Sequence, residues 1–124
     1  MKKFFALCVL STLSLAFNAA HAHGSTKPVH GGVVQMVGDT SFELVTRPDG
    51  AEVYLIDDGE DMSSEGLSGK LTIDNAGTKS EAVLAPAGGN KLAAQSAKIP
   101  SGAKVVVLLI LKDASKLRAT FLIP

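Results

Sequence analysis

The three histidines of the chain lie close together near its amino terminus. They are His21, His23 and His30, and two glycines, Gly31 and Gly32, follow the last of them. Imidazole nitrogens are good ligands for copper, zinc, nickel and cobalt ions. The first chemistry that these residues suggest is therefore transition-metal binding.

Residues 1–22 have the three parts of a secretory signal peptide. Lys2 and Lys3 form a basic start, an apolar run covers residues 4–17, and small residues lead to Ala22. The apolar run, about 14 residues, is shorter than the roughly 20 that cross a bilayer as a helix. We therefore predict a cleaved signal peptide, a periplasmic location and no membrane anchor after cleavage.

The position of cleavage decides which nitrogen donors the mature chain offers. Cleavage after Ala22 makes His23 the first residue, so that its α-amine and ring Nδ1 bind one ion and His30 adds a second imidazole. This T of three nitrogens suits Cu(II), which favours square-planar nitrogen donors. Cleavage after Ala20 begins the chain with His21-Ala22-His23 instead, and a histidine in third place also gives a square-planar site for Cu(II) or Ni(II). Both alternatives predict a metal-binding end.

The rest of the chain consists of short β-type runs separated by turn residues. Residues 91–97 fit either a short strand or a helical turn, and the continuous apolar run 105–111 is expected to be buried on both faces. About seven strands without a convincing helix predict an all-β fold, either an antiparallel β-sandwich (immunoglobulin-like) or a partly open barrel. The expected strands cover residues 33–37, 40–46, 51–57, 67–73, 80–85, 105–111 and 117–123.

These features divide the chain into three segments. They are a signal peptide at 1–22, a flexible histidine-containing segment at 23–32 and one β-sandwich domain at 33–124. The roughly 100 residues left after cleavage are enough for one modest core. The alternation of the strands assigns to that core Phe42, Leu44, Val53, Leu55, Leu71, Ile73, Leu84, Val107, Leu109 and Phe121.

The turn at Gly38-Asp39 sets the register of the first hairpin. A two-residue turn there pairs Val37 with Thr40 and Val34 with Glu43. Opposite residues share a face, so Glu43 points away from the core and towards the strand that follows the histidine segment. Met36, roughly 20 Å from His30 along a straight strand, can share an ion with His30 only if the chain folds back at the glycine pair, where no Cβ obstructs a close approach.

Glu43 is the best candidate for an additional ligand, with a solvated outward side chain as the alternative. Met36 and Met62 offer thioether sulfur to Cu(I), although methionine at such positions more often packs. The predicted metal ligands are therefore His23, His30 and Glu43.

Composition excludes several other functions. The lone Cys8 lies in the signal, and no basic patch indicates nucleic acid. The histidines, which are the side chains best suited to act as general bases, belong to the amino-terminal segment. No nucleophile elbow or phosphate-binding glycine loop is present in the sequence. A histidine-bound copper could activate oxygen on a polysaccharide, but with no tryptophan and only Tyr54 there is little aromatic surface to hold sugar. We predict that the protein is not an enzyme.

Several short motifs resemble small exported bacterial proteins associated with heavy-metal efflux systems, and similar modules on periplasmic efflux adaptor subunits. They are His30-Gly31-Gly32-Val33-Val34, Phe42-Glu43-Leu44-Val45, a strand ending in Asp57, the stretch 84–92 and Ala119-Thr120-Phe121. The resemblance covers nearly all of residues 28–124. It implies a β-sandwich that binds or hands over copper, zinc, cobalt or nickel. Family members often carry another histidine where this chain has Ser41. This difference argues against a metal site on the sheet and favours His23 and His30 as the ligands.

Together these patterns predict a periplasmic protein that binds a divalent transition metal. Cu(II) is favoured over zinc, nickel and cobalt, and the expected task is buffering or delivery to an efflux system. The expected partners are the ion and a periplasmic efflux adaptor or other envelope protein. The alternative is a metal-independent module that docks on an envelope or pump component through its sheet.

Overall fold

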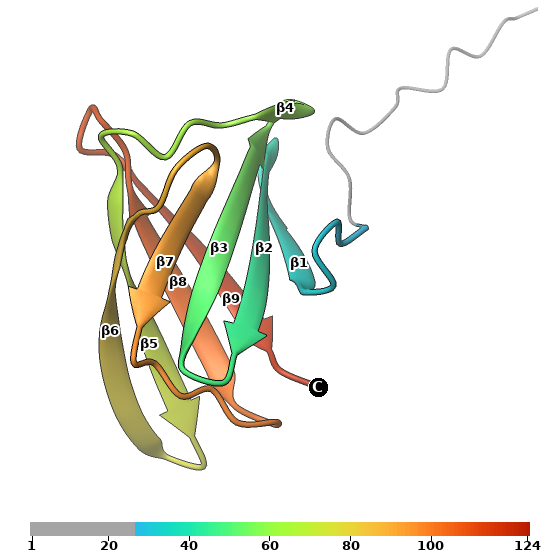
Figure 1. Ribbon diagram of the computed structural model, residues 1–124, viewed down its shortest axis with the longest axis vertical. Helices are drawn as coiled ribbons and strands as arrows, with labels where there is room; N and C mark the ends of the chain where they lie inside the picture. The colour runs from blue at the N-terminus through green and yellow to red at the C-terminus, as the bar shows by residue number, and fades with distance from the viewer. Residues whose placement is uncertain (1–26) are drawn as a thin grey trace, which may run out of the picture.

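The structure is a computed structural model that describes residues 27–124 (Figure 1). The predicted signal peptide, His21 and His23 lie outside the described residues. Within the described range the chain forms nine β-strands and no helix. The strands are β1 (Val33–Val37), β2 (Thr40–Arg47), β3 (Gly50–Asp57), β4 (Glu60–Asp61), β5 (Ser68–Asn75), β6 (Thr78–Pro86), β7 (Lys91–Gln95), β8 (Lys104–Ile110) and β9 (Lys116–Leu122).

All paired strands are antiparallel, in the order β1-β2-β3-β7-β6-β5-β8-β9, and β4 pairs with β3 beyond the end of β7. β6 joins the two halves because most of it pairs with β5 while Ala85 and Pro86 pair with β7. The first and last strands of the order, β1 and β9, lie side by side without a ladder between them in the described chain (Figure 1). The sheet is therefore nearly closed into a barrel.

This architecture confirms the predicted all-β antiparallel fold. Each of the seven expected strands is present, with ends that differ by no more than two residues. Residues 91–95 form a strand, which decides between the two alternatives for that segment. β4, only two residues long, has no periodicity that a sequence pattern could detect. In the part of the chain that the structure describes, no helix is long and apolar enough to cross a membrane.

The register of the first hairpin is the one that the turn chemistry predicts. Val37 pairs with Thr40 and Val34 with Glu43, and Gly38 in the turn has a φ of +59°. Glycine adopts this backbone conformation without a steric cost, so the two-residue turn closes. The register directs Phe42 into the core and its neighbour Glu43 to the outer face of the sheet.

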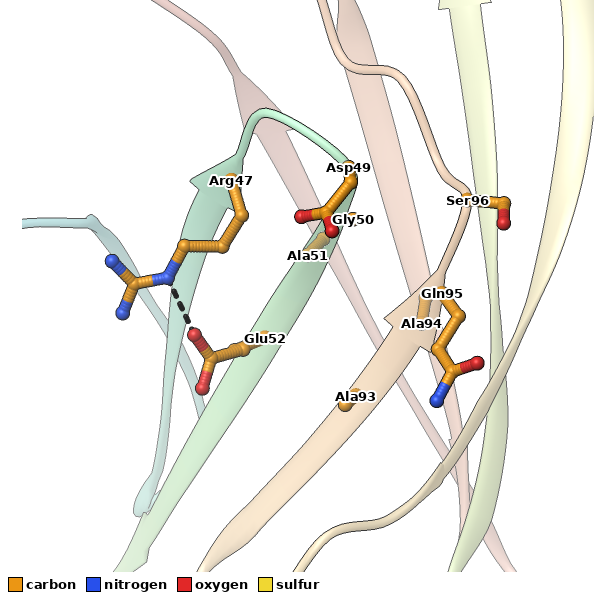
Figure 2. Close-up of a pocket in the computed structure, with 9 residues that line it drawn as sticks. All are labelled: Arg47, Asp49, Gly50, Ala51, Glu52, Ala93, Ala94, Gln95 and Ser96. Atoms are coloured by element: carbon orange, nitrogen blue, oxygen red, sulfur yellow. Dashed lines mark hydrogen bonds and ion pairs between the residues drawn. The ribbon is translucent and has the colours of Figure 1, made fainter.

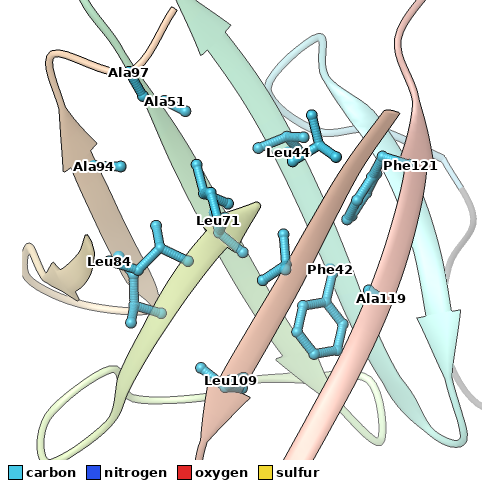
Figure 3. Packing of buried hydrophobic residues seen from close by; sticks show 14 of the residues in the cluster. Phe42, Leu44, Ala51, Leu71, Leu84, Ala94, Ala97, Leu109, Ala119 and Phe121 are labelled. Atoms are coloured by element: carbon cyan, nitrogen blue, oxygen red, sulfur yellow. The ribbon is translucent and has the colours of Figure 1, made fainter. Parts of the chain in front are cut away.

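The core lies between the two halves of the sheet, and the side chains labelled in Figure 3 point into it from both. All ten predicted core residues are buried, none more than 3% exposed. The structure adds several small residues that a hydrophobic pattern ranks low. The additional core members are Ala51, Leu67, Leu92, Ala94, Ala97, Ala103, Val105 and Ala119.

The prediction that residues 105–111 are buried on both faces is wrong. β8 alternates between buried and half-buried residues, with Val105, Val107 and Leu109 facing the core. A continuous apolar run marks a strand covered on both faces in a parallel sheet, but β8 belongs to an antiparallel sheet with one face in the core.

Truncating a core aromatic tests this packing. Phe121→Ala removes a fully buried ring from β9, and we expect it to lower the free energy of unfolding by about 3–5 kcal/mol. Val83→Ala is the matched control because that side chain is 76% exposed, and its expected effect is within about 0.5 kcal/mol. Chemical denaturation of both variants measures the difference, and equal losses would contradict the assigned core.

Candidate functional site

The Glu43 carboxylate on β2 is enclosed by the segment that precedes β1. The backbone N–H groups of Val29, His30 and Gly32 donate to its oxygens at 3.0, 2.8 and 2.9 Å. The His30 ring adds a fourth contact, with Nδ1 3.0 Å from Glu43 Oε1. Each carboxylate oxygen thus receives two hydrogen bonds, which fill its lone pairs. Glu43 faces outward as predicted, but it is only 5% exposed.

Two glycines allow the segment to lie against the sheet. Gly31 has a φ of +74°, which turns the chain back over β2. A Cβ on Gly32 would stand 2.3 Å from the Leu44 carbonyl oxygen and 2.9 Å from Val45 Cγ2. The backbone therefore touches β2 directly at this point. Residues 29–32, expected to be part of a flexible segment, are tied to the sheet through Glu43.

The His30 ring is held on a second side by Tyr54 of β3, the residue paired with Glu43. The two rings are stacked, with centroids 3.5 Å apart and planes inclined by 10°. The Tyr54 hydroxyl donates to Glu52 Oε2 at 3.1 Å. The imidazole thus lies on an aromatic surface while its Nδ1 edge faces a carboxylate.

Glu52 is itself fixed by two cations. Arg47 binds one of its oxygens, and Lys91 Nζ lies 3.2 Å from the other. Figure 2 shows the Arg47–Glu52 contact near the turn that joins β2 to β3, where a groove of about 340 Å³ is also lined by Asp49 and Gln95. This groove contains no imidazole. It is connected to the site only through Glu52, which lines the groove and accepts the hydrogen bond from the Tyr54 hydroxyl.

The hydrogen bonds determine the protonation of the site. Burial by itself would raise the pKa of the Glu43 carboxyl. The hydrogen bonds, led by that from the Gly32 N–H and then that from the His30 ring, outweigh burial and lower this pKa below its ordinary value. An ionised carboxylate only accepts hydrogen bonds, so Nδ1 of His30 must carry the proton. When the ring is neutral, its Nε2 keeps a lone pair. The His30 side chain is 36% exposed, so a ligand can reach the ring from solvent.

A cavity of about 210 Å³ adjoins the His30 ring. Its wall combines the pair His30 and Glu43 with groups from three further strands and the loop before β7. The lining residues are Lys27, Val29, His30, Val34, Ser41, Glu43, Tyr54, Ile56, Asp61 and Asn90. The cavity is therefore polar at several points and has an imidazole in its wall.

The predicted metal ligands are only partly placed. His30 and Glu43 are brought together, whereas His23 lies outside the described residues. Met36 is half-buried on β1, and Met62 packs against the hydrophobic core. Among residues 27–124 no group of three or more His, Cys, Asp or Glu side chains is arranged to hold a metal ion.

Sequence reasoning missed three residues of this site, Tyr54, Asp61 and Asn90. Tyr54 could have been found by extending the predicted pairing across the second hairpin, because it stands opposite Glu43. Asp61 and Asn90 reach the cavity through a two-residue strand and a loop, neither of which has a sequence periodicity.

Comparisons of the chain with protein-family models, with curated proteins and with solved structures gave no match. The resemblance to efflux-associated proteins therefore stays a prediction.

The path of the segment can be tested at its two glycines. Gly32→Ala places a methyl group on the backbone of β2, so we expect residues 29–32 to lift from the sheet and the stacked His30 ring to lose its upfield-shifted NMR signals. Gly31→Ala, where the space is open but φ is positive, should cost about 1–2 kcal/mol and keep those signals. Retention of the shifted signals in Gly32→Ala would contradict the described path.

The lowered pKa of Glu43 predicts how stability depends on pH. A carboxyl whose folded-state pKa lies below its unfolded value of 4.5 stabilises the fold fully above that value, and the stabilisation is lost as the pH falls through the folded-state pKa. Glu43→Gln cannot titrate, so its melting temperature should fall less than that of the wild type between about pH 5 and pH 3.

Glu65→Gln removes an exposed carboxyl and should retain the wild-type slope. Metal-free protein is used throughout, and parallel curves for wild type and Glu43→Gln would refute the assigned hydrogen bonds.

Proposed function

We propose that the chain is an exported periplasmic protein that binds a divalent transition-metal ion, most strongly Cu(II), and buffers it or delivers it to an efflux system. Zinc, nickel and cobalt are weaker alternatives. The ligands are Nε2 of His30 and the nitrogen donors of His23.

The hydrogen bond between Glu43 and His30 is the observation that carries this proposal. Histidines that bind metals nearly always donate their other ring N–H to a carboxylate or carbonyl, which fixes the tautomer and the ring orientation. His30 has this arrangement, because its Nδ1 is hydrogen-bonded to Glu43 and its Nε2 keeps a lone pair that can bind a metal ion. Because the lone pairs of Glu43 are filled, its role is to orient His30 and not to bind the ion directly.

Chain length permits His23 to join His30. Three residues stand between His23 and Lys27, so four steps of at most about 3.6 Å each limit the distance between their Cα atoms to roughly 14 Å. Lys27 lines the same cavity as His30. Two imidazoles and an α-amine would then supply the nitrogen donors that Cu(II) favours.

Buffering or delivery fits this donor set better than catalysis. The described cavity holds one imidazole, and its Nδ1 is already engaged by Glu43. Export to the periplasm follows from the predicted signal peptide, and transfer to an efflux adaptor follows from the resemblance.

The second candidate is a metal-independent docking module. The saturation of Glu43 by the segment 29–32 favours it, because the same four hydrogen bonds also serve as a purely structural clasp for the chain before β1. In that case the partner binds the outer sheet face and the histidines have no ligand role.

Metal titration of the correctly processed protein distinguishes the two candidates. Wild type should bind Cu(II) with submicromolar affinity, and His23→Ala and His30→Ala should each lose it. Glu43→Gln should bind about 10- to 100-fold more weakly. Arg118→Gln, on β9 outside the site, is the control. Absent or unchanged binding across this series overturns the metal proposal, and partner capture by the double histidine variant supports the docking module. Intact-mass analysis of the exported protein establishes the cleavage position.

A further inference from the structure

Asp61 lines the same cavity as the His30 ring. It is the second residue of β4 and pairs with Ile56 of β3, while its neighbour Glu60 pairs with Asp57. Successive side chains of a strand point to opposite faces. Asp61 accordingly lines the cavity that contains His30, and Glu60 does not.

The strand register places Asp61 within reach of the imidazole. On the same side of β3, Lys91 of β7 pairs with Tyr54, and Asp61 pairs with Ile56 two residues further on. Asp61 is therefore a diagonal neighbour of Tyr54, at a distance of about 7–8 Å that an aromatic side chain such as Tyr54 can span. The His30 ring is stacked on Tyr54, so carboxylate and imidazole face one small cavity.

The Asp61 carboxylate is only weakly engaged. Asn90 is fixed by two hydrogen bonds with Leu55. Its side-chain N–H donates to the Leu55 carbonyl at 3.0 Å, and its backbone carbonyl accepts from the Leu55 N–H at 2.9 Å. The same side-chain nitrogen lies 3.5 Å from Asp61 Oδ1. No other hydrogen bond or ion pair of this carboxylate is present among residues 27–124. Its remaining oxygen contrasts with the saturated oxygens of Glu43.

We propose that Asp61 is a direct ligand of the ion bound by Nε2 of His30, an inference that rests on the proposed function. One imidazole and one carboxylate suit divalent ions such as Cu(II), Zn(II), Ni(II) and Co(II), whereas carboxylate oxygen is a poor ligand for Cu(I). The cavity volume of about 210 Å³ leaves space for water molecules beside the ion. Lys27 also lines the wall of this cavity and is exposed.

The adjacent carboxylates of β4 supply a matched experiment. Asp61→Asn and Glu60→Gln each remove one negative charge without a large change of volume, at neighbouring positions of which only Asp61 lines the cavity. Cu(II) and Zn(II) affinities are measured by competition with a chelator of known affinity. We expect Asp61→Asn to bind each ion roughly 10-fold or more weakly and Glu60→Gln to bind within about twofold of the wild type.

The outcomes separate this inference from the proposed function. If the wild type binds neither ion, the proposed function fails and the inference fails with it. If the wild type binds and Asp61→Asn binds equally well, only the inference fails. Equal losses in both variants indicate a general charge effect and also overturn it. Asp61→Ser, with thermal unfolding of the metal-free protein as the folding check, repeats the test should Asp61→Asn unfold.

Discussion

The positions of the His30 ring and of residues 29–32 depend on one buried charge. A carboxylate removed from water is strongly unfavourable unless hydrogen bonds compensate it, and Glu43 obtains all four of its hydrogen bonds from residues 29–32. The buried Glu43 carboxylate of β2 is therefore stabilised only when residues 29–32 lie against the sheet, and the same hydrogen bonds fix the path of residues 29–32. The orientation of the His30 ring is a consequence of this mutual requirement.

The nearly closed sheet gives this arrangement rigid support. Phe42 and Leu44 fix β2 in the core on either side of Glu43, and Val53 and Leu55 do the same for β3 on either side of Tyr54. Alternation along two paired strands thus anchors two outward residues that face each other. The carboxylate and the aromatic ring that hold His30 are in this way supported by the hydrophobic core and do not depend on flexible loops.

Sequence patterns predicted the strands, the core and the first register because each has a local cause: period-two alternation, turn residues and apolar side chains. The same register placed Glu43 outward and towards the strand that follows His30, and the glycine pair permitted a close approach of the backbone without predicting it. The burial of Glu43 and the stacking on Tyr54 were not predicted, because they result from the segment folding back on the sheet. Asp61 was not predicted to be part of the site because a strand of two residues has no sequence pattern. The burial of β8 on both faces was predicted wrongly because a continuous apolar run does not show which face of a strand is covered.

The unpaired edges of β1 and β9 have a consequence for behaviour in solution. A strand that hydrogen-bonds on one side only exposes backbone groups that can pair with another chain and start aggregation. Here the two edges lie next to each other, so each shields the other from an intruding strand although no ladder joins them. The fold thereby protects its own ends without complete closure, and the seam between β1 and β9 is the place where opening of the barrel would first expose it to self-association.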